Sequence, residues 1–213
     1  LDLFSIDVLW TPRHLGAEVI YEKNQSKDAA KVQKYLQVRE AMRFPVAPAT
    51  SSGNTNNNGC DIFKIHGPKT PAHGNLNNHS LALVIGYAGT KFLLTGDQES
   101  AAWNELLGDS EFVRDVAGTD ILLASHHGRE SGFHEGLFEA IGNPALTIIS
   151  DVQGSGTSVR EKYSSRSTGQ RVVSRETGIA STRRTLSTHF DGTIEVKCHL
   201  DELGQGWRTI SRR

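Results

Sequence analysis

Residues that can bind a metal follow two apolar segments in the middle of the chain. The first segment, 91–95, is followed after one glycine by Asp97, and the second segment, 120–125, is followed by His126 and His127. Carboxylate oxygens and imidazole nitrogens are common ligands of divalent metals, and one carboxylate can join two ions. Because ligands gather beyond the carboxyl ends of the strands in an open α/β sheet, the pattern predicts a shared metal site at one sheet edge.

Each of these features also has a simpler interpretation. Gly-Asp after a strand is common in turns, and adjacent histidines often lie in solvated loops. The succession is more specific than either part, because both ligand groups follow strongly apolar segments and the residues between them, 99–107, have the pattern of a helix. We therefore keep the metal site as the leading prediction.

The segments around this site alternate between strand and helix patterns. Strands are predicted at 5–12, 60–68, 80–87, 91–95, 120–125, 146–150 and 204–213, and helices at 28–44, 99–107 and 133–141. Ala88 and Gly89 predict a tight hairpin turn, because glycine readily adopts a positive φ. The order of elements predicts the α/β fold class.

Three further segments have a composition or pattern that predicts a particular structure or role. Segment 45–59 is rich in Pro, Ser and Asn and predicts a mobile loop, with a substrate lid as the alternative. Segment 160–184 carries seven basic residues against two acidic ones, which indicates either a surface that contacts phosphate groups or a solvated face. Segment 186–197 predicts a hairpin that turns at Asp191 and Gly192.

Length and composition fit one domain. The chain has 213 residues, 37% of them hydrophobic, and a net charge of −1, so bulk charge indicates neither nucleic acid nor membrane as a partner. Cys60 and Cys198 form neither a metal-binding spacing nor a disulfide framework, which favours a reducing compartment and a cytoplasmic location. No apolar run reaches the ~18 residues of a membrane helix.

Five short motifs occur in one fixed order between residues 62 and 196. They are Asn77–Leu83, Phe92–Asp97, Asp120–Gly128, Thr147–Ser150 and Thr188–Ile194. This succession resembles the metallo-β-lactamase superfamily, in its ComEC-like branch of hydrolases. The resemblance implies a four-layer αββα sandwich, of which residues 1–213 would form a single domain comprising mostly the C-terminal half. It also implies two metal ions, zinc with manganese as an alternative, that activate a hydroxide to hydrolyse phosphodiesters or other esters.

The resemblance assigns roles by position. Asp97 matches the metal-bridging Asp and would orient the hydroxide. His126 or His127 matches the last metal-binding His, and we favour His127 because it stands directly before a glycine. Asn77 matches the Asn of the Asn-x-x-Ser motif, and His79 is either a further ligand or a loop residue.

Substrate contacts are predicted around the histidine pair. Asn77, Ser125, Arg129 and Ser131 are the candidate substrate-binding residues, with ordinary loop positions as the alternative. The basic segment 160–184 is the candidate surface for a nucleic acid or another phosphodiester substrate.

The chain departs from the superfamily pattern in one large respect. The string His-x-His-x-Asp-His does not occur in it. Either the chain is a fragment that lacks about the first 60–100 residues of the fold, or it is a degenerate relative. We favour the fragment, because Leu1, which is not a Met, falls just after where that motif would be and because Asp97 and His126-His127 are intact. A missing N-terminal segment or a partner chain would then supply most of the ligands, since zinc takes about four.

Two function classes follow. The first is a metal-dependent hydrolase, in particular a phosphodiesterase or nuclease. The alternative is a non-catalytic regulatory or assembly subunit with the same fold, which binds a protein or nucleic-acid partner. An amide hydrolase of the β-lactamase type fits less well, because the basic segment 160–184 favours phosphate chemistry.

Overall fold

The computed structural model describes residues 9–22, 29–42, 59–70, 74–152 and 159–213. Its strands are β1 (Ile62–His66), β2 (Ala82–Tyr87), β3 (Thr90–Leu94), β4 (Ile121–Leu123), β5 (Leu146–Ile149), β6 (Gln170–Ser174), β7 (Ala180–Arg183), β8 (Thr185–Ser187), β9 (Ile194–Leu200) and β10 (Gly206–Arg212). Its α-helices are α1 (Ala17–Glu22), α2 (Ala29–Ala41), α3 (Ser100–Leu107), α4 (Ser110–Val116), α5 (Glu135–Ile141), α6 (Arg160–Ser165) and α7 (Thr188–Asp191). Short 3₁₀ segments are η2 (Leu76–His79), η3 (Ser125–Gly128) and η4 (Glu130–Gly132).

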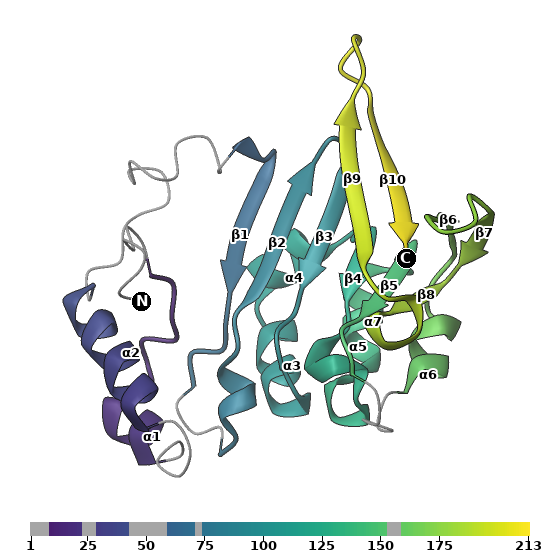
Figure 1. The fold of residues 1–213 in the computed structure, drawn as a ribbon. Helices are drawn as coiled ribbons and strands as arrows, with labels where there is room; N and C mark the ends of the chain where they lie inside the picture. Colours follow the sequence, from purple (N-terminus) through teal and green to yellow (C-terminus); the bar gives the residue numbers. More distant parts are fainter. Residues whose placement is uncertain (1–8, 23–28, 43–58, 71–73, 153–158) are drawn as a thin grey trace.

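The first sheet has the strand order β1-β2-β3-β4-β5-β8 (Figure 1). β2 is antiparallel to both of its neighbours, β1 and β3, whereas β3, β4, β5 and β8 run parallel. The turn between β2 and β3 has φ values of +50° at Ala88 and +69° at Gly89, so the predicted hairpin is confirmed. Because four neighbouring strands are parallel, their carboxyl ends meet at one edge of the sheet.

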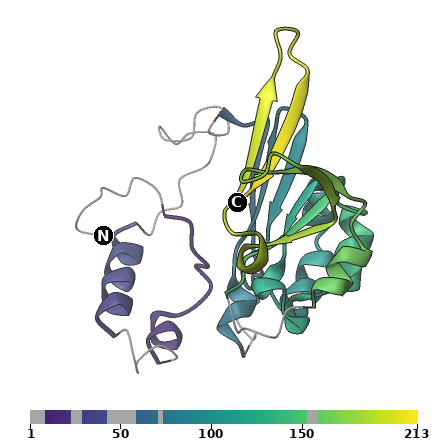
Figure 2. The same cartoon turned by 45° about the vertical axis from the view of Figure 1, so that its right-hand side comes forward.

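Helices cover one face of this sheet and a second sheet covers part of the other (Figures 1 and 2). On the helical face, Trp103, Phe112 and Tyr163 pack with Val84 and Leu93 in one core cluster. The second sheet has the order β7-β6-β10-β9. A second cluster joins the two sheets and contains the buried residues Ile121, Leu146, Val172, Leu186 and Ile210. The α/β class is therefore confirmed.

Helices α1 and α2 form a pair that lies to the side of β1, apart from the other helices (Figures 1 and 2). Arg39 on α2 holds this pair to the preceding loop by donating to three carbonyl oxygens between Pro12 and Leu15. The contact with the rest of the molecule includes His14 Nε2, which lies 2.8 Å from His79 Nδ1. No residue of α2 is buried.

The predicted hairpin 186–197 is wrong. β8 joins the first sheet parallel to β5, whereas β9 pairs with β10 in the second sheet. Asp191, which is buried, explains the crossing because its carboxylate accepts a hydrogen bond from Ser187 N at 2.9 Å. It also pairs with Arg183 at 3.1 Å and Arg212 at 3.5 Å. One carboxylate thus joins strands of both sheets at the point where the chain changes layer.

Other predictions differ in extent. Of the strand predicted at 5–12, residues 9–12 are not in a strand and the remainder lies outside the described residues. The predicted mobile loop 45–59 also lies outside them, apart from Gly59. Helix α4 was not predicted, although Asp109 caps it by accepting Glu111 N at 2.9 Å. Among the described helices, none has the length and apolarity that crossing a membrane requires.

Candidate functional site

Asp97 lies at the carboxyl edge of the first sheet, just beyond β3. Gly96 has a φ of +60°, and a Cβ at this position would lie 2.9 Å from Cβ of Ser80, so both conformation and space require glycine. The amide of Asp97 donates to Ser80 Oγ at 3.1 Å. These constraints turn the chain outward and leave the Asp97 side chain 42% exposed.

The chain beyond β4 has an unusual backbone. His126, His127 and Gly128 follow one another with φ values of +47°, +57° and +72°. The left-handed conformation costs a non-glycine residue about 1–2 kcal/mol, although His tolerates it better than most residues. The amide of His126 donates to Gly96 O at 3.1 Å, which ties this turn to the end of β3. Strain of this kind is concentrated at functional sites in proteins.

This turn points His127 at Asp97. The distance from His127 Nε2 to Asp97 Oδ1 is 3.7 Å. His127 Nδ1 lies 2.7 Å from the carbonyl oxygen of Ser150, and because a carbonyl can only accept, Nδ1 carries the proton. In the neutral imidazole the lone pair of Nε2 therefore faces the carboxylate. Two such groups repel each other unless the ring is protonated or a cation lies between them.

His126 has a different environment, although it is the direct neighbour of His127. Its side chain is only 12% exposed, and Nδ1 lies 2.9 Å from Glu99 Oε1. Asn77 Nδ2 donates to the same carboxylate oxygen at 3.2 Å, and Arg129 lies 3.3 Å from His126 Nε2. Because a guanidinium can only donate, Nε2 is the acceptor and Nδ1 donates to Glu99. His126 is thus held inside a hydrogen-bond network, while His127 is presented to solvent.

The predicted substrate residues divide into two groups. Ser125 is buried and its hydroxyl donates to Gln98 O at 2.6 Å, so the structure does not place it on the surface of the site. Arg129 and Ser131 are exposed beside His126, and Ser131 Oγ lies 2.9 Å from His126 Nδ1. Asn77 contacts the same network, as described above. These three residues lie near the histidine pair, as the sequence predicts.

His79 is not placed on the exposed part of this edge. It is 3% exposed and contacts His14, as described above. Within the described parts of the chain, no group of three or more His, Cys, Asp or Glu side chains is arranged to hold a metal ion. Asp97 and His127 therefore form a pair of donors, whereas a zinc site takes about four ligands.

Two residues at this edge were missed by sequence reasoning. Glu99, at the start of α3, is the centre of the His126 network. Asp151 follows β5, and its Oδ1 accepts hydrogen bonds from Ser187 Oγ at 2.6 Å and His189 N at 3.2 Å. For Asp151, the available signal was the same rule that pointed to Asp97, namely a carboxylate just after a buried parallel strand.

The basic segment 160–184 is partly neutralised. Lys162, Arg166, Arg175 and Arg183 form ion pairs with Glu130, Glu135, Glu195 and Asp191, respectively. A polar pocket of about 260 Å³ in this segment is lined by Arg160, Arg183 and Arg184, by the acidic Glu161, and by Ser164, Thr182 and Thr185. The segment therefore offers a local basic pocket rather than a broad basic surface.

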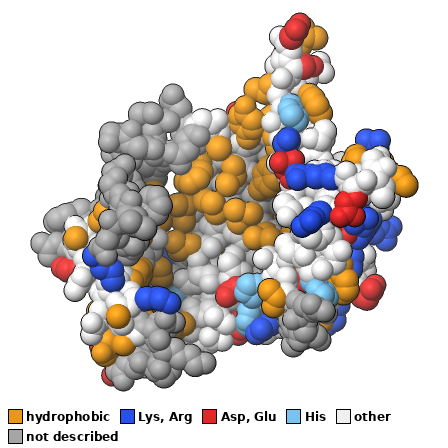
Figure 3. Space-filling view, viewed as in Figure 1, with side chains coloured by type: hydrophobic (Ala, Val, Ile, Leu, Met, Phe, Trp, Pro, Cys, Tyr) orange, Lys and Arg blue, Asp and Glu red, His pale blue; other side chains and the backbone are white. Residues whose placement is uncertain are grey.

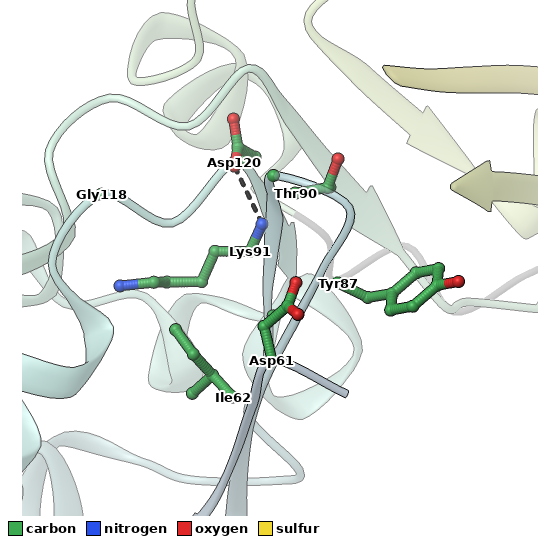
Figure 4. Close-up of a pocket in the computed structure, with 9 residues that line it drawn as sticks. Asp61, Ile62, Tyr87, Thr90, Lys91, Gly118 and Asp120 are labelled. Carbon is green, nitrogen blue, oxygen red and sulfur yellow. Dashed lines mark hydrogen bonds between the residues drawn. The ribbon is translucent and has the colours of Figure 1, made fainter. Parts of the chain in front are cut away.

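Another pocket, of about 300 Å³, lies at the opposite edge of the first sheet, and its side chains have structural roles (Figure 4). Asp120 accepts a hydrogen bond from Lys91 N at 2.9 Å, and Asp61 accepts one from Ala88 N at 3.1 Å. Tyr87 points away from the other labelled side chains (Figure 4). These hydrogen bonds stabilise the ends of the strands around the pocket, and the pocket is not our candidate site.

Comparison with protein-family models and with curated proteins finds no match for this chain. The family suggested by the motifs therefore stays a prediction. The function has to be argued from the geometry of the carboxyl edge.

Proposed function

We propose that residues 1–213 form part of a metal-dependent hydrolase with the metallo-β-lactamase αββα sandwich, and that its substrate is a phosphodiester, such as a nucleic acid. The observation that carries this proposal is the Asp97–His127 pair. A carboxylate and an imidazole lone pair face each other across 3.7 Å at the exposed edge where parallel strands end.

The chemistry of this pair fits zinc or manganese. The bond from His127 Nδ1 to the Ser150 carbonyl fixes the ring and its tautomer, which is the usual outer-shell arrangement of a metal-binding histidine. The number of donors is incomplete, because a zinc site takes about four. Further ligands would have to come from outside the described residues. A bound ion would supply Lewis acidity and a lowered pKa for a coordinated water.

The surrounding residues support an anionic substrate. Arg129 is exposed beside His126 and directly follows the turn that presents His127. Arg160 lies with its guanidinium 5.4 Å from the ring centre of Phe190, next to His189. Guanidinium groups bind phosphate oxygens in a bidentate manner, so these side chains would orient a phosphodiester.

A second candidate function is a non-catalytic subunit that keeps the fold. The incomplete donor set favours it, since Asp97 and His127 alone form a weak metal site. In this case the Asp97–His127 contact would be a surface ion pair that contributes little, because both side chains are about half exposed.

Metal binding tests the proposal directly. We would titrate the chain with zinc and with manganese by calorimetry, and compare it with Asp97→Ala, His127→Ala and the control His199→Ala, whose ring stacks on Trp207 in the second sheet. We expect Asp97→Ala and His127→Ala each to weaken binding at least tenfold and the control to leave it unchanged. Equal binding in all four proteins would refute the metal pair.

Activity is the second stage of this test. Hydrolysis of bis(p-nitrophenyl) phosphate and of single-stranded DNA would be assayed in the metal-loaded chain, with an excess of chelator as the blank. Turnover that requires both Asp97 and His127 supports the hydrolase. Specific metal binding without turnover would favour the subunit interpretation.

A further inference from the structure

The face of the first sheet that lies opposite the helices is covered over only part of its width. Beneath the second sheet, Ile121 and Leu146 pack against Val172, Leu186 and Ile210. β1, β2 and β3 extend beyond this covered part. Figure 3 shows an apolar surface over these strands, to the left of β9.

Strand register defines the apolar surface over β1–β3. One row across the three strands is Phe63, Ile85 and Phe92, and the next row is Ile65, Leu83 and Leu94. We call these six side chains the open face. All six are only partly buried.

The opposite face of the same strands is covered by helices. Ala82 and Val84, which alternate with Leu83 and Ile85 along β2, point towards the helices and are fully buried. The contrast within one strand shows that β2 is apolar on both faces but is covered on one. A contiguous apolar surface of this kind marks an interaction site in soluble proteins.

The open face is continuous with an interface that already exists. Phe92 belongs to its first row and also packs against the cluster between the two sheets. β9, the strand next to the open face, reaches the same cluster through Ile194 and Val196. A further strand beside β9 would therefore lie over β1–β3 at the spacing of stacked sheets, about 10 Å.

β9 also has a free edge. Among the described strands it pairs only with β10. It carries Leu200, which is 52% exposed. A long edge strand with unpaired backbone groups is a template for strand addition, and natural proteins ordinarily cover such an edge. The free edge of β9 and the open face lie side by side. One polypeptide can therefore pair with the backbone groups of β9 and cover the apolar side chains of the open face.

We propose that the open face and the free edge of β9 together bind a β-hairpin or larger β-segment of a partner polypeptide. Its first strand pairs with β9, and its apolar residues, at every second position, pack on the open face. This interaction does not depend on the proposed metal site.

A second copy of the chain fits this site less well. Pairing β9 with β9 of another copy would continue the second sheet, but in each copy β1–β3 extend past β9 on the side away from β10 (Figure 1). With both first sheets on the same side of the joined second sheet, the two sets of strands would occupy the same space. A thin β-segment without its own first sheet avoids this clash.

Two substitutions on one strand test whether the face is open. Ile85→Lys places a charge on the open face, whereas Val84→Lys places it in the core of the helical face. We expect Ile85→Lys to fold, with a midpoint of thermal unfolding within about 4 °C of the parent, and Val84→Lys not to fold. If Ile85→Lys also fails to fold, the chain itself already covers the face and the proposal is overturned.

Binding is tested with a library of displayed β-hairpins, two randomised seven-residue strands joined by Asn-Gly, selected on the immobilised chain. We expect enriched hairpins with apolar residues at alternate positions, binding that Ile85→Lys weakens more than tenfold, and slower hydrogen exchange in β9. The control Ile179→Lys changes an exposed side chain outside the open face and should have no effect. No enrichment, or equal binding to Ile85→Lys, overturns the proposal. So does a concentration-dependent dimer that Ile85→Lys dissociates, because it would assign the site to a second copy.

Discussion

Removing the charge of Glu99 should loosen the turn that carries both histidines. Glu99 is 19% exposed and accepts hydrogen bonds from Asn75 at 2.9 Å, from Asn77 at 3.2 Å and from His126 at 2.9 Å. The left-handed backbone of His126 and His127 is unfavourable by itself, so these bonds hold it in place. Glu99→Gln keeps the shape of the side chain and removes its charge, so the change in unfolding free energy reports the electrostatic contribution of Glu99.

The magnitude follows from the hydrogen bonds. A bond to a charged group contributes about 1.5–3 kcal/mol, against about 0.5–1.5 kcal/mol for a neutral pair. We therefore expect Glu99→Gln to cost about 1.5 kcal/mol of unfolding free energy, or roughly 3–6 °C in the midpoint for a chain of this size. His126→Asn, which keeps a residue that tolerates positive φ, should cost a similar amount because Asn cannot reach Glu99.

A double-mutant cycle by urea denaturation measures whether the two residues act together. If the network holds, Glu99→Gln should cost little in the His126→Asn background, which gives a coupling free energy of about 1 kcal/mol. Glu111→Gln is the matched control, because Glu111 is 60% exposed and its pair with Arg114 should contribute almost nothing. Additive losses, with a coupling below about 0.3 kcal/mol, would refute the reasoning.

Four further predictions concern the parts that support this edge. Gly96→Ala should destabilise the fold by about 2 kcal/mol, because the new Cβ would meet Ser80 in a left-handed conformation; chemical denaturation measures this, and an unchanged midpoint would contradict it. Asp191→Asn should cost about 3 kcal/mol by leaving two arginines without their buried partner, which thermal unfolding would detect. Burial raises the pKa of Tyr163 well above its ordinary value. The contribution of the protonated Tyr163 to the unfolding free energy is therefore fully present below pH ~10 and falls as the pH rises further, because the unfolded chain then loses this proton. Spectrophotometric titration should show one tyrosine that ionises only on unfolding. The pKa of Asp109 is lowered, first by the hydrogen bond from Glu111 N, so the stabilising effect of Asp109 is present above pH ~4 and is lost as the pH falls below it; Asp109→Ala should lower the midpoint at pH 7 but hardly at pH 2.5.

The centre of the first sheet could be predicted from the sequence because its signals are local. The segments 91–95, 120–125 and 146–150 are short apolar runs, and each forms a strand. Ala88 and Gly89 form the predicted turn because few dipeptides other than those with glycine adopt two successive positive φ values. The rule that ligands gather beyond the carboxyl ends of parallel strands predicted that Asp97 and His127 lie close together, and their side chains are 3.7 Å apart.

The remainder depends on contacts between distant residues. Nothing in the pair His126-His127 tells which ring is exposed; the difference arises from Glu99, which lies on another element. Similarly, Asp191 resembles a hairpin turn locally, and only its contacts with Arg183 and Arg212 show that it joins two sheets. The open face could not be predicted, since an apolar strand has the same sequence whether one or both of its faces are covered.

The position of β10 in the second sheet has a consequence for how the chain folds during synthesis. β10 lies between β6 and β9, although it is made after both. Until residues 206–212 have left the ribosome, β6 and β7 form a two-stranded ribbon, which is marginally stable alone. Ile210, which is 1% exposed, is also absent from the cluster between the sheets during that interval. A nascent chain stopped before β10 would therefore expose Leu146 and Leu186, and a delay at that point of translation would favour aggregation or binding to a chaperone.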